Sequence, residues 1–140
     1  MNAFILSLLV LFLMNGEGGF FTSYSSQNQS LSQLKVSKSG RYLVKENGDS
    51  FFWLGDTGWN LFIRLNREEA KKYLTDRHDK KFTVIQAHVL GWSITDENAY
   101  GYKPFVNNNF NTPNEDYWTH VDYIIQTAED LGLYMGLLPA

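Results

Sequence analysis

The sequence contains no cysteine, which excludes disulfide bonds, thiolate metal ligands and a cysteine nucleophile. It also lacks a long basic or acidic run, and its net charge is −3 with an isoelectric point near 5.5. Nucleic-acid-binding proteins usually carry a basic patch, so we expect no nucleic-acid partner. Neither G-x-G-x-x-G nor G-x-x-x-x-G-K-[ST] occurs, so nucleotide binding through the usual phosphate loops is not expected. With 140 residues, the chain has room for one ordinary domain at most.

Long hydrophobic runs are absent except at the start, where Ala3 to Met14 reads AFILSLLVLFLM. This run is shorter than the roughly 20 residues that span a bilayer, and it is typical of the apolar region of a secretory signal. A polar stretch follows, so we predict a signal peptide and polar leader over residues 1–30. The product would be secreted, periplasmic or held at the cell surface, with no stable membrane span after cleavage. A buried N-terminal helix or a membrane anchor stays open, because the start carries no Lys or Arg and no A-x-A cleavage site follows.

Aromatic residues, by contrast, make up 16% of the chain. Such side chains build cores, and they also stack on flat apolar ligand surfaces such as sugar rings. The first regular pattern begins at Leu34, where short alternating runs are separated by KSG and ENGD. Asn47-Gly48 favours a tight hairpin turn. We therefore predict a small antiparallel hairpin that leads into a buried strand over Phe51–Gly55.

Two helices are predicted from their capping signals. Asn66 followed by Glu69 forms a capping box, and that helix should end near residues 78–80. The second helix is expected to begin with Thr112 as its cap and to end at Gly132. One face of the second helix carries Tyr117, Val121, Ile124, Ala128 and Leu131.

Apolar, β-branched runs lie between these helices and after them. Residues 82–90 read FTVIQAHVL, which is typical of a strand buried on both faces of a parallel sheet. A long aromatic loop follows over residues 91–111, and a further strand begins near Leu133. Strands that alternate with helices predict an α/β fold with a parallel sheet and right-handed crossovers. Either an open doubly wound sheet or the start of an eight-stranded barrel fits this order.

Three segments together resemble a known family. SGRYLVKENGDSFFWLGDTGWNLF, VIQAHVLGW and GLYMGLLPA are similar to the start of apiosidase-like glycoside hydrolases, which are glycoside hydrolase family 140 and its relatives. The resemblance implies the N-terminal portion of a (β/α)8 TIM barrel, with about three of its eight strands, preceded by a small β-hairpin. It also implies a secreted glycosidase that acts on plant pectic side chains, with apiose as the best-defined target sugar.

The resemblance implies a retaining mechanism with two carboxylates, one as acid/base and the other as nucleophile. In such barrels these residues lie on later strands, so we assign no catalytic residue here and expect the pair beyond Ala140. A complete barrel needs about 250 residues. We therefore interpret residues 31–140 as an N-terminal fragment of the catalytic domain or a truncated gene product. Such a chain would lack the C-terminal part of its own barrel and would be inactive alone.

The binding residues are sought at the C-terminal ends of the strands, where barrel active sites lie. After the first strand we predict that Asp56, Thr57 and Trp59 contact an oligosaccharide or polysaccharide substrate. From the second strand and its exit we select three more side chains, namely Gln86, His88 and Trp92. Gln86 and His88 point the same way because strand side chains alternate with a period of two.

Plainer interpretations stay open for these residues. Asp56 could cap a turn, Trp59 could pack against the barrel, and His88 could be a hydrogen-bonded core residue. The loop acids Asp96 and Glu97 are adjacent, so their side chains diverge and do not form the opposed pair of glycoside hydrolysis. One carboxylate and one imidazole are too few ligands for a metal, so we expect neither metal nor cofactor. A non-catalytic carbohydrate-binding module and a metal-dependent barrel hydrolase remain as alternatives.

Overall fold

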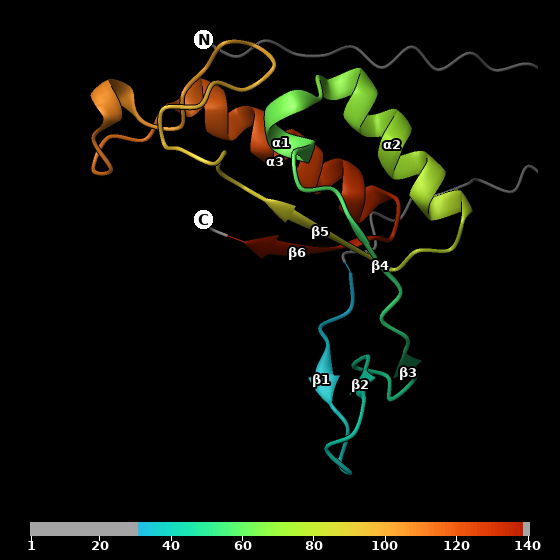
Figure 1. Cartoon of the computed structure of the whole chain (residues 1–140). Coiled ribbons are helices and arrows are strands. Elements are labelled where there is room, and N and C mark those ends of the chain that lie inside the picture. Colours follow the sequence, from blue (N-terminus) through green and yellow to red (C-terminus); the bar gives the residue numbers. More distant parts are fainter. Residues whose placement is uncertain (1–30, 139–140) are drawn as a thin grey trace, which may run out of the picture.

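A computed structural model describes residues 31–138 (Figure 1). The predicted signal peptide and leader, residues 1–30, lie outside the described residues, as do residues 139–140. The described helices are too short or too polar to cross a bilayer. The elements in chain order are β1 (Lys35–Val36), β2 (Leu43–Val44), β3 (Ser50–Phe51), β4 (Gly55–Thr57), α1 (Leu61–Arg64), α2 (Arg67–Asp79), β5 (Val84–His88), η1 (Val106–Asn108), α3 (Glu115–Asp130) and β6 (Tyr134–Leu138).

The first three strands form a small antiparallel sheet in the order β1-β2-β3. The chain turns at Gly40 and Gly48, which have φ angles of 73° and 90° that favour glycine. At the second turn, the Gly48 amide donates to the Lys45 carbonyl, and the Lys45 amide donates to the Asp49 carbonyl, each at 2.9 Å. The predicted hairpin turn at Asn47-Gly48 is therefore confirmed.

The predicted buried strand over Phe51–Gly55 is wrong, because this stretch is divided between two sheets. Phe51 ends the antiparallel sheet, and the first parallel strand begins only at Gly55. Between them Phe52 is 75% exposed and Trp53 is 47% exposed. The chain changes its pairing partner here from β2 to β5. The Thr83 hydroxyl bridges the gap by donating to the Phe52 carbonyl at 2.7 Å.

The helices follow their capping residues, with one addition and one correction. Both hydrogen bonds of the Asn66–Glu69 capping box are present at the start of α2. The short helix α1 precedes it and was not predicted. The N-cap of α3 is Asn114 and not Thr112, because the Asn114 side chain accepts from the Asp116 amide at 3.2 Å. Gly132, with a φ of 74°, follows the end of α3 as expected.

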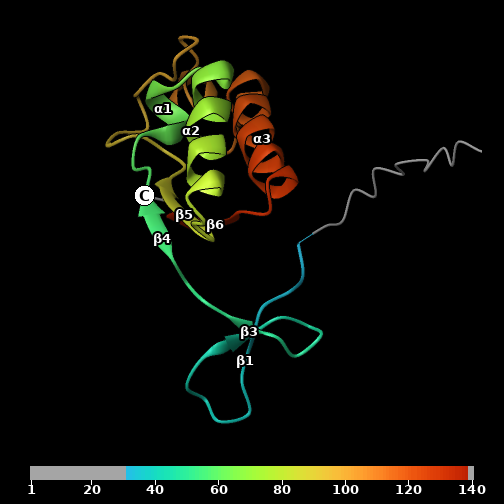
Figure 2. The same ribbon diagram turned by 90° about the vertical axis from the view of Figure 1, so that its right-hand side faces the viewer.

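The three remaining strands form a parallel sheet in the order β4-β5-β6 (Figure 1). This confirms the predicted alternation of parallel strands and helices. The strand predicted over residues 82–90 is shorter in the structure, where β5 spans Val84–His88. All three α-helices pack against one side of this sheet, and the antiparallel sheet lies apart from them (Figure 2).

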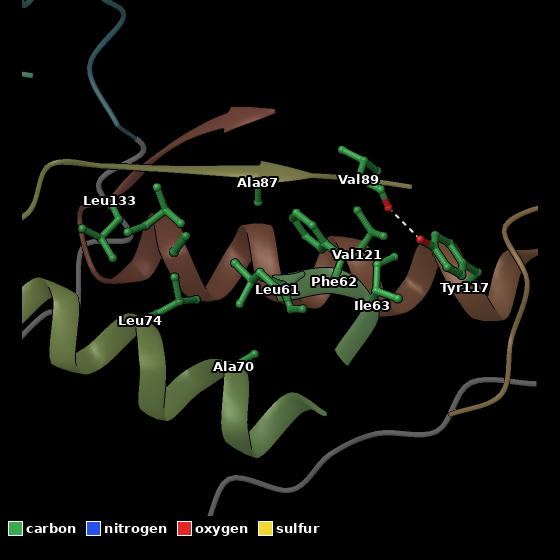
Figure 3. Packing of buried hydrophobic residues seen from close by; sticks show 13 residues of the cluster. Leu61, Phe62, Ile63, Ala70, Leu74, Ala87, Val89, Tyr117, Val121 and Leu133 are labelled. Atoms are coloured by element: carbon green, nitrogen blue, oxygen red, sulfur yellow. Dashed lines mark hydrogen bonds between the residues drawn. The ribbon is translucent and has the colours of Figure 1, made fainter. Parts of the chain in front are cut away.

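The hydrophobic core fills the space between the parallel sheet and the helices (Figure 3). Phe62 of α1 and Leu74 of α2 are fully buried there, against Ile85 of β5. Tyr117 of α3 is also buried, and its hydroxyl donates to the Val89 carbonyl at 2.6 Å, which ties α3 to the end of β5. Of the apolar face predicted for α3, Tyr117, Val121, Ile124 and Ala128 are buried, and Leu131 packs against the core from its edge.

Candidate functional site

The parallel sheet has two faces of opposite character. On β5, Ile85 and Ala87 point into the core beneath the helices, so Gln86 and His88 point to the opposite side. We call the side that carries Ile85 and Ala87 the helix face, and the side that carries Gln86 and His88 the open face. Gln86 and His88 are only half-buried within the described residues.

The strand register assigns neighbours to the open face. Thr57 of β4 and Gly136 of β6 both pair with Gln86. A side chain at Gly136 would begin only 3.2 Å from the Gln86 Cγ atom, so the glycine leaves the space that Gln86 occupies. The Gln86 carbonyl accepts from the Gly58 amide at 2.8 Å, which fixes the exit of β4 beside β5. The open face thus brings Thr57 and Gln86 together.

Two tryptophans and a histidine gather at the C-terminal ends of β4 and β5. The Trp59 ring lies 5.1 Å from the His88 ring, and the Trp92 ring lies 5.5 Å from it on centroid distances, with tilts of 41° and 45°. We call this group the Trp59–His88–Trp92 stack. The His88 amide also donates to the Trp59 carbonyl at 3.3 Å. Trp92 is 84% exposed and Trp59 is 42% exposed, so both indoles offer free surface.

Asp56 lies on the opposite side of β4 from Thr57. It pairs with Ile85, and its carboxylate faces α2, where Oδ2 accepts from the Tyr73 hydroxyl at 2.8 Å and from the Arg77 guanidinium. Oδ1 accepts from the Thr57 amide at 2.9 Å. The structure therefore turns the Asp56 carboxylate away from the open face, where the side chains of Thr57, Gln86 and His88 lie.

The charge of Asp56 is stabilised by its partners. Partial burial raises the pKa of Asp56, but hydrogen bonds from Arg77, Tyr73 and the Thr57 amide outweigh it and hold that pKa below its usual value. Burial and the neighbouring carboxylate raise the pKa of Tyr73 to about 12, so the phenol remains a donor. The Arg77 guanidinium lies 4.7 Å from the centre of the Tyr73 ring, which adds a cation–π contact.

The loop after β5 is organised by Asp96, which the sequence presents only as one of two adjacent loop acids with diverging side chains. Its Oδ2 accepts from the Ser93 amide at 3.0 Å, and its own amide donates to the Ser93 carbonyl at 2.9 Å. A side chain at Gly91 would begin 2.6 Å from the Asp96 Cβ atom, so the turn closes tightly over this glycine. The spacing of Ser and Asp three residues apart in S-I-T-D is the sequence signal for this turn.

A second polar residue missed by sequence reasoning is His120 of α3. It is 1% exposed, and its ring meets the Tyr100 ring edge to face at a centroid distance of 5.1 Å. Neither imidazole nitrogen has a hydrogen-bond partner of normal geometry, although the carbonyls of Phe62 and Leu65 lie beside the ring. Burial lowers the pKa of His120, and the charge of Arg67 lowers it further. Within residues 31–138, no group of three or more His, Asp or Glu side chains could hold a metal ion.

The family comparison covers most of the chain. A family model described as "Apiosidase-like, catalytic domain" matches residues 37–140. The match begins directly after β1 ends and continues through all three parallel strands. It therefore includes every residue of the open face and of the Trp59–His88–Trp92 stack. A search of curated proteins found no match.

Solved structures of glycoside hydrolases are also similar to this chain. A structure titled "Glycoside hydrolase" is 44% identical over 79% of this chain, with a TM-score of 0.70. A second, titled as a glycoside hydrolase family 5 protein from Bacteroides vulgatus, is 40% identical over 79% of this chain, also with a TM-score of 0.70. The chain spans 25% and 24% of the length of these two proteins.

Proposed function

Because the chain belongs to the family of apiosidase-like catalytic domains, we propose that it forms the N-terminal portion of a TIM-barrel glycoside hydrolase. The full enzyme would act on plant pectic side-chain glycosides. The parallel order β4-β5-β6, with helices on one side, supports the barrel because TIM barrels repeat this unit. Identity of 40% or more to two solved glycoside hydrolases supports the reaction class.

The Trp59–His88–Trp92 stack is the observation that carries the proposal. Two indoles with free surface stand at the C-terminal ends of neighbouring parallel strands, where barrel enzymes bind their substrates. Indole faces stack on the apolar face of a sugar ring. The Thr57 hydroxyl, the Gln86 amide and the His88 imidazole supply donors and acceptors for sugar hydroxyl groups. The two indoles contact the flat face of a sugar ring, and the polar side chains contact the hydroxyl groups at its edge.

We assign no bond cleavage to residues 31–138. Retaining glycosidases need two carboxyl groups about 5–5.5 Å apart on either side of the scissile bond. Two acids that lie close in sequence to the stack tryptophans already accept hydrogen bonds, Asp56 from Tyr73 of α2 and Asp96 from the Ser93 amide. In this proposal the acid/base and the nucleophile come from segments other than the described residues. The chain supplies part of the substrate wall, and the remaining barrel strands are its structural partner.

A non-catalytic carbohydrate-binding module is the second candidate. The engagement of Asp56 and Asp96 in structural hydrogen bonds favours it, because a binding module needs the stack and no free carboxylate pair. The family match favours the enzyme, since it is to a catalytic domain. Both candidates share the sugar-binding site. They differ in whether the full enzyme proposed above hydrolyses the bound glycoside. Secretion remains part of the proposal and rests on the apolar run at residues 3–14.

Isothermal titration calorimetry of the full chain with pectic side-chain oligosaccharides tests the binding site. We expect saturable heat for the wild-type chain and a loss of affinity of about tenfold or more for His88→Ala, because polar groups of the sugar lose a partner. Trp53→Ala is the matched control, since Trp53 is an exposed indole outside the stack. Loss of binding in Trp53→Ala and not in His88→Ala would contradict the proposed site. Release of reducing sugar by the chain would contradict the assignment of catalysis to other segments.

A further inference from the structure

We infer that Asp56 and Asp96 are positioning residues that hold Trp59 and Trp92, respectively, against His88. Each acid lies close in sequence to one indole, and its carboxylate accepts hydrogen bonds from protein donors. The consequence of these positions for sugar binding rests on the proposed function. The positioning of the two indoles does not, because the stack exists without a ligand. Asp56 is thereby reassigned from direct sugar contact to support of the residue that makes it.

Asp56 fastens the end of β4 to α2. Its Oδ2 accepts from Tyr73 and Arg77, which lie one helical turn apart on α2. Its Oδ1 accepts from the amide of Thr57, the last residue of β4. The carboxylate therefore joins the helix layer to the backbone from which the Trp59 turn departs.

Tyr73, which bonds to Asp56, also contacts the turn that leads from β4 to Trp59. A side chain at Gly58 would begin 3.1 Å from the Tyr73 hydroxyl oxygen and 3.4 Å from Ile85 Cγ2. Gly58 thus packs directly against the phenol that Asp56 holds, and Trp59 is the next residue. Movement of Tyr73 would free the turn on one side, although the Gly58 amide would still donate to the Gln86 carbonyl on the other.

Asp96 performs the corresponding task for Trp92. Its carboxylate bonds to the Ser93 amide, one residue beyond the indole, and its side chain covers Gly91, one residue before the indole. The Ser93 hydroxyl and the Thr95 hydroxyl bond to each other at 2.8 Å and tighten the turn further. Trp92 is highly exposed, so packing against the core does not hold it and the closed turn must do so.

Tryptophan fluorescence of the full chain tests these roles without a sugar. An imidazole ring in contact with an indole changes the emission of that indole. The part of the tryptophan quenching that disappears in His88→Gln reports the stack. A Trp92→Phe background isolates the Trp59 contact, and a Trp59→Phe background isolates the Trp92 contact. Each background keeps one indole beside His88.

In the Trp92→Phe background, Asp56→Ala should reduce the His88-dependent quenching at least about twofold, because a supporting residue holds a site to about 0.5 Å. Asp56→Asn should restore part of it, since its one carbonyl oxygen still accepts from either Tyr73 or the Thr57 amide. Asp76→Ala is the matched control, because Asp76 pairs with Arg77 but lies on α2 itself. Should Asp56→Ala fail to fold, Tyr73→Phe removes only the hydroxyl and must still reduce the quenching.

In the Trp59→Phe background, Asp96→Ala should also lower the quenching about twofold or more, with Glu97→Ala as the exposed neighbour control. Quenching that stays unchanged while urea stability falls would show a merely structural role and overturn the inference. A wild-type chain without any His88-dependent quenching would overturn it as well.

The sugar titration is a separate measurement, so the two ideas fail separately. If oligosaccharides do not bind while Asp56→Ala and Asp96→Ala still lower the quenching, the proposed function falls and the positioning roles stand. If oligosaccharides bind and neither substitution changes the quenching, only the positioning roles are refuted.

Discussion

The two faces of the parallel sheet use the same strands for different purposes. On the helix face of β5, Ile85 and Ala87 are fully buried beneath the helices. On the open face, Gln86 and His88 are half-buried, and the Trp59–His88–Trp92 stack stands at its C-terminal edge. One residue of displacement along the strand separates the two environments, because side chains alternate between faces. The fold thereby separates the residues that stabilise it from those we assign to recognition.

The largest effect should come from the helix face. Phe62→Ala removes a fully buried ring from the core between α1 and the sheet. We expect the free energy of unfolding to fall by about 3–5 kcal/mol, as is typical for buried Phe→Ala substitutions. Urea denaturation followed by circular dichroism measures this loss. A change below about 1 kcal/mol would mean that the helix face does not carry the stability we assign to it.

On the open face, Trp59→Ala should lower oligosaccharide affinity strongly and stability only slightly. The indole is 42% exposed, so its removal should change the free energy of unfolding by about 1 kcal/mol or less. Oligosaccharide affinity should fall about tenfold or more, because stacking on an aromatic ring is lost. Calorimetric titration and urea denaturation of the same sample provide both numbers. A large stability loss with unchanged affinity would place Trp59 with the core residues.

The buried His120 of α3, on the helix side of the sheet, should make the stability depend on pH. Burial lowers its folded pKa, so the folded state favours the neutral imidazole. The contribution to stability is complete above the unfolded pKa of about 6.5 and is lost as the pH falls through the folded value. Urea midpoints should therefore decrease from pH 7 to pH 5, and His120→Gln should flatten this decrease. A decrease of the same size in His120→Gln would contradict this assignment.

The smallest effect is expected for Gly136→Ala on the open face. The added methyl group would lie 3.2 Å from Gln86 Cγ, and the flexible Gln86 side chain can move away. We expect a stability change below about 1 kcal/mol, because only a small shift of one side chain is required. The displaced amide should nevertheless weaken oligosaccharide binding by about two- to fivefold, since its hydrogen bonds change geometry. Equal affinity in both chains would remove Gln86 from the binding site.

Local signals in the sequence predicted much of the fold. The Asn47-Gly48 turn, the Asn66–Glu69 capping box and Gly132 each act on neighbouring residues, so their effects could be read directly. The order of strands and helices followed from hydrophobic patterning. The division of the Phe51–Gly55 stretch could not be predicted, because it depends on Thr83 and on pairing with β5, about 30 residues away.

The candidate site shows the same limit. The sequence placed Asp56 and Trp59 at the end of one strand, and Gln86 with His88 on one side of another. It could not decide which side of β4 the helices cover, and that choice turns Asp56 toward Arg77 and leaves Thr57 beside Gln86. Strand register and the partner of each carboxylate are long-range properties, so the structure was needed to separate the two.

The most direct test of the account uses the four tryptophans as reporters in one NMR titration of the full chain with pectic oligosaccharides. Trp59 and Trp92 lie in the stack, Trp53 lies beside the antiparallel sheet, and the Trp118 indole donates to the Pro104 carbonyl on the helix side. We predict that the indole N–H signals of Trp59 and Trp92 shift together and saturate, while those of Trp53 and Trp118 stay in place. Saturable shifts of Trp53 or Trp118 with fixed signals for Trp59 and Trp92 would contradict recognition by the open face.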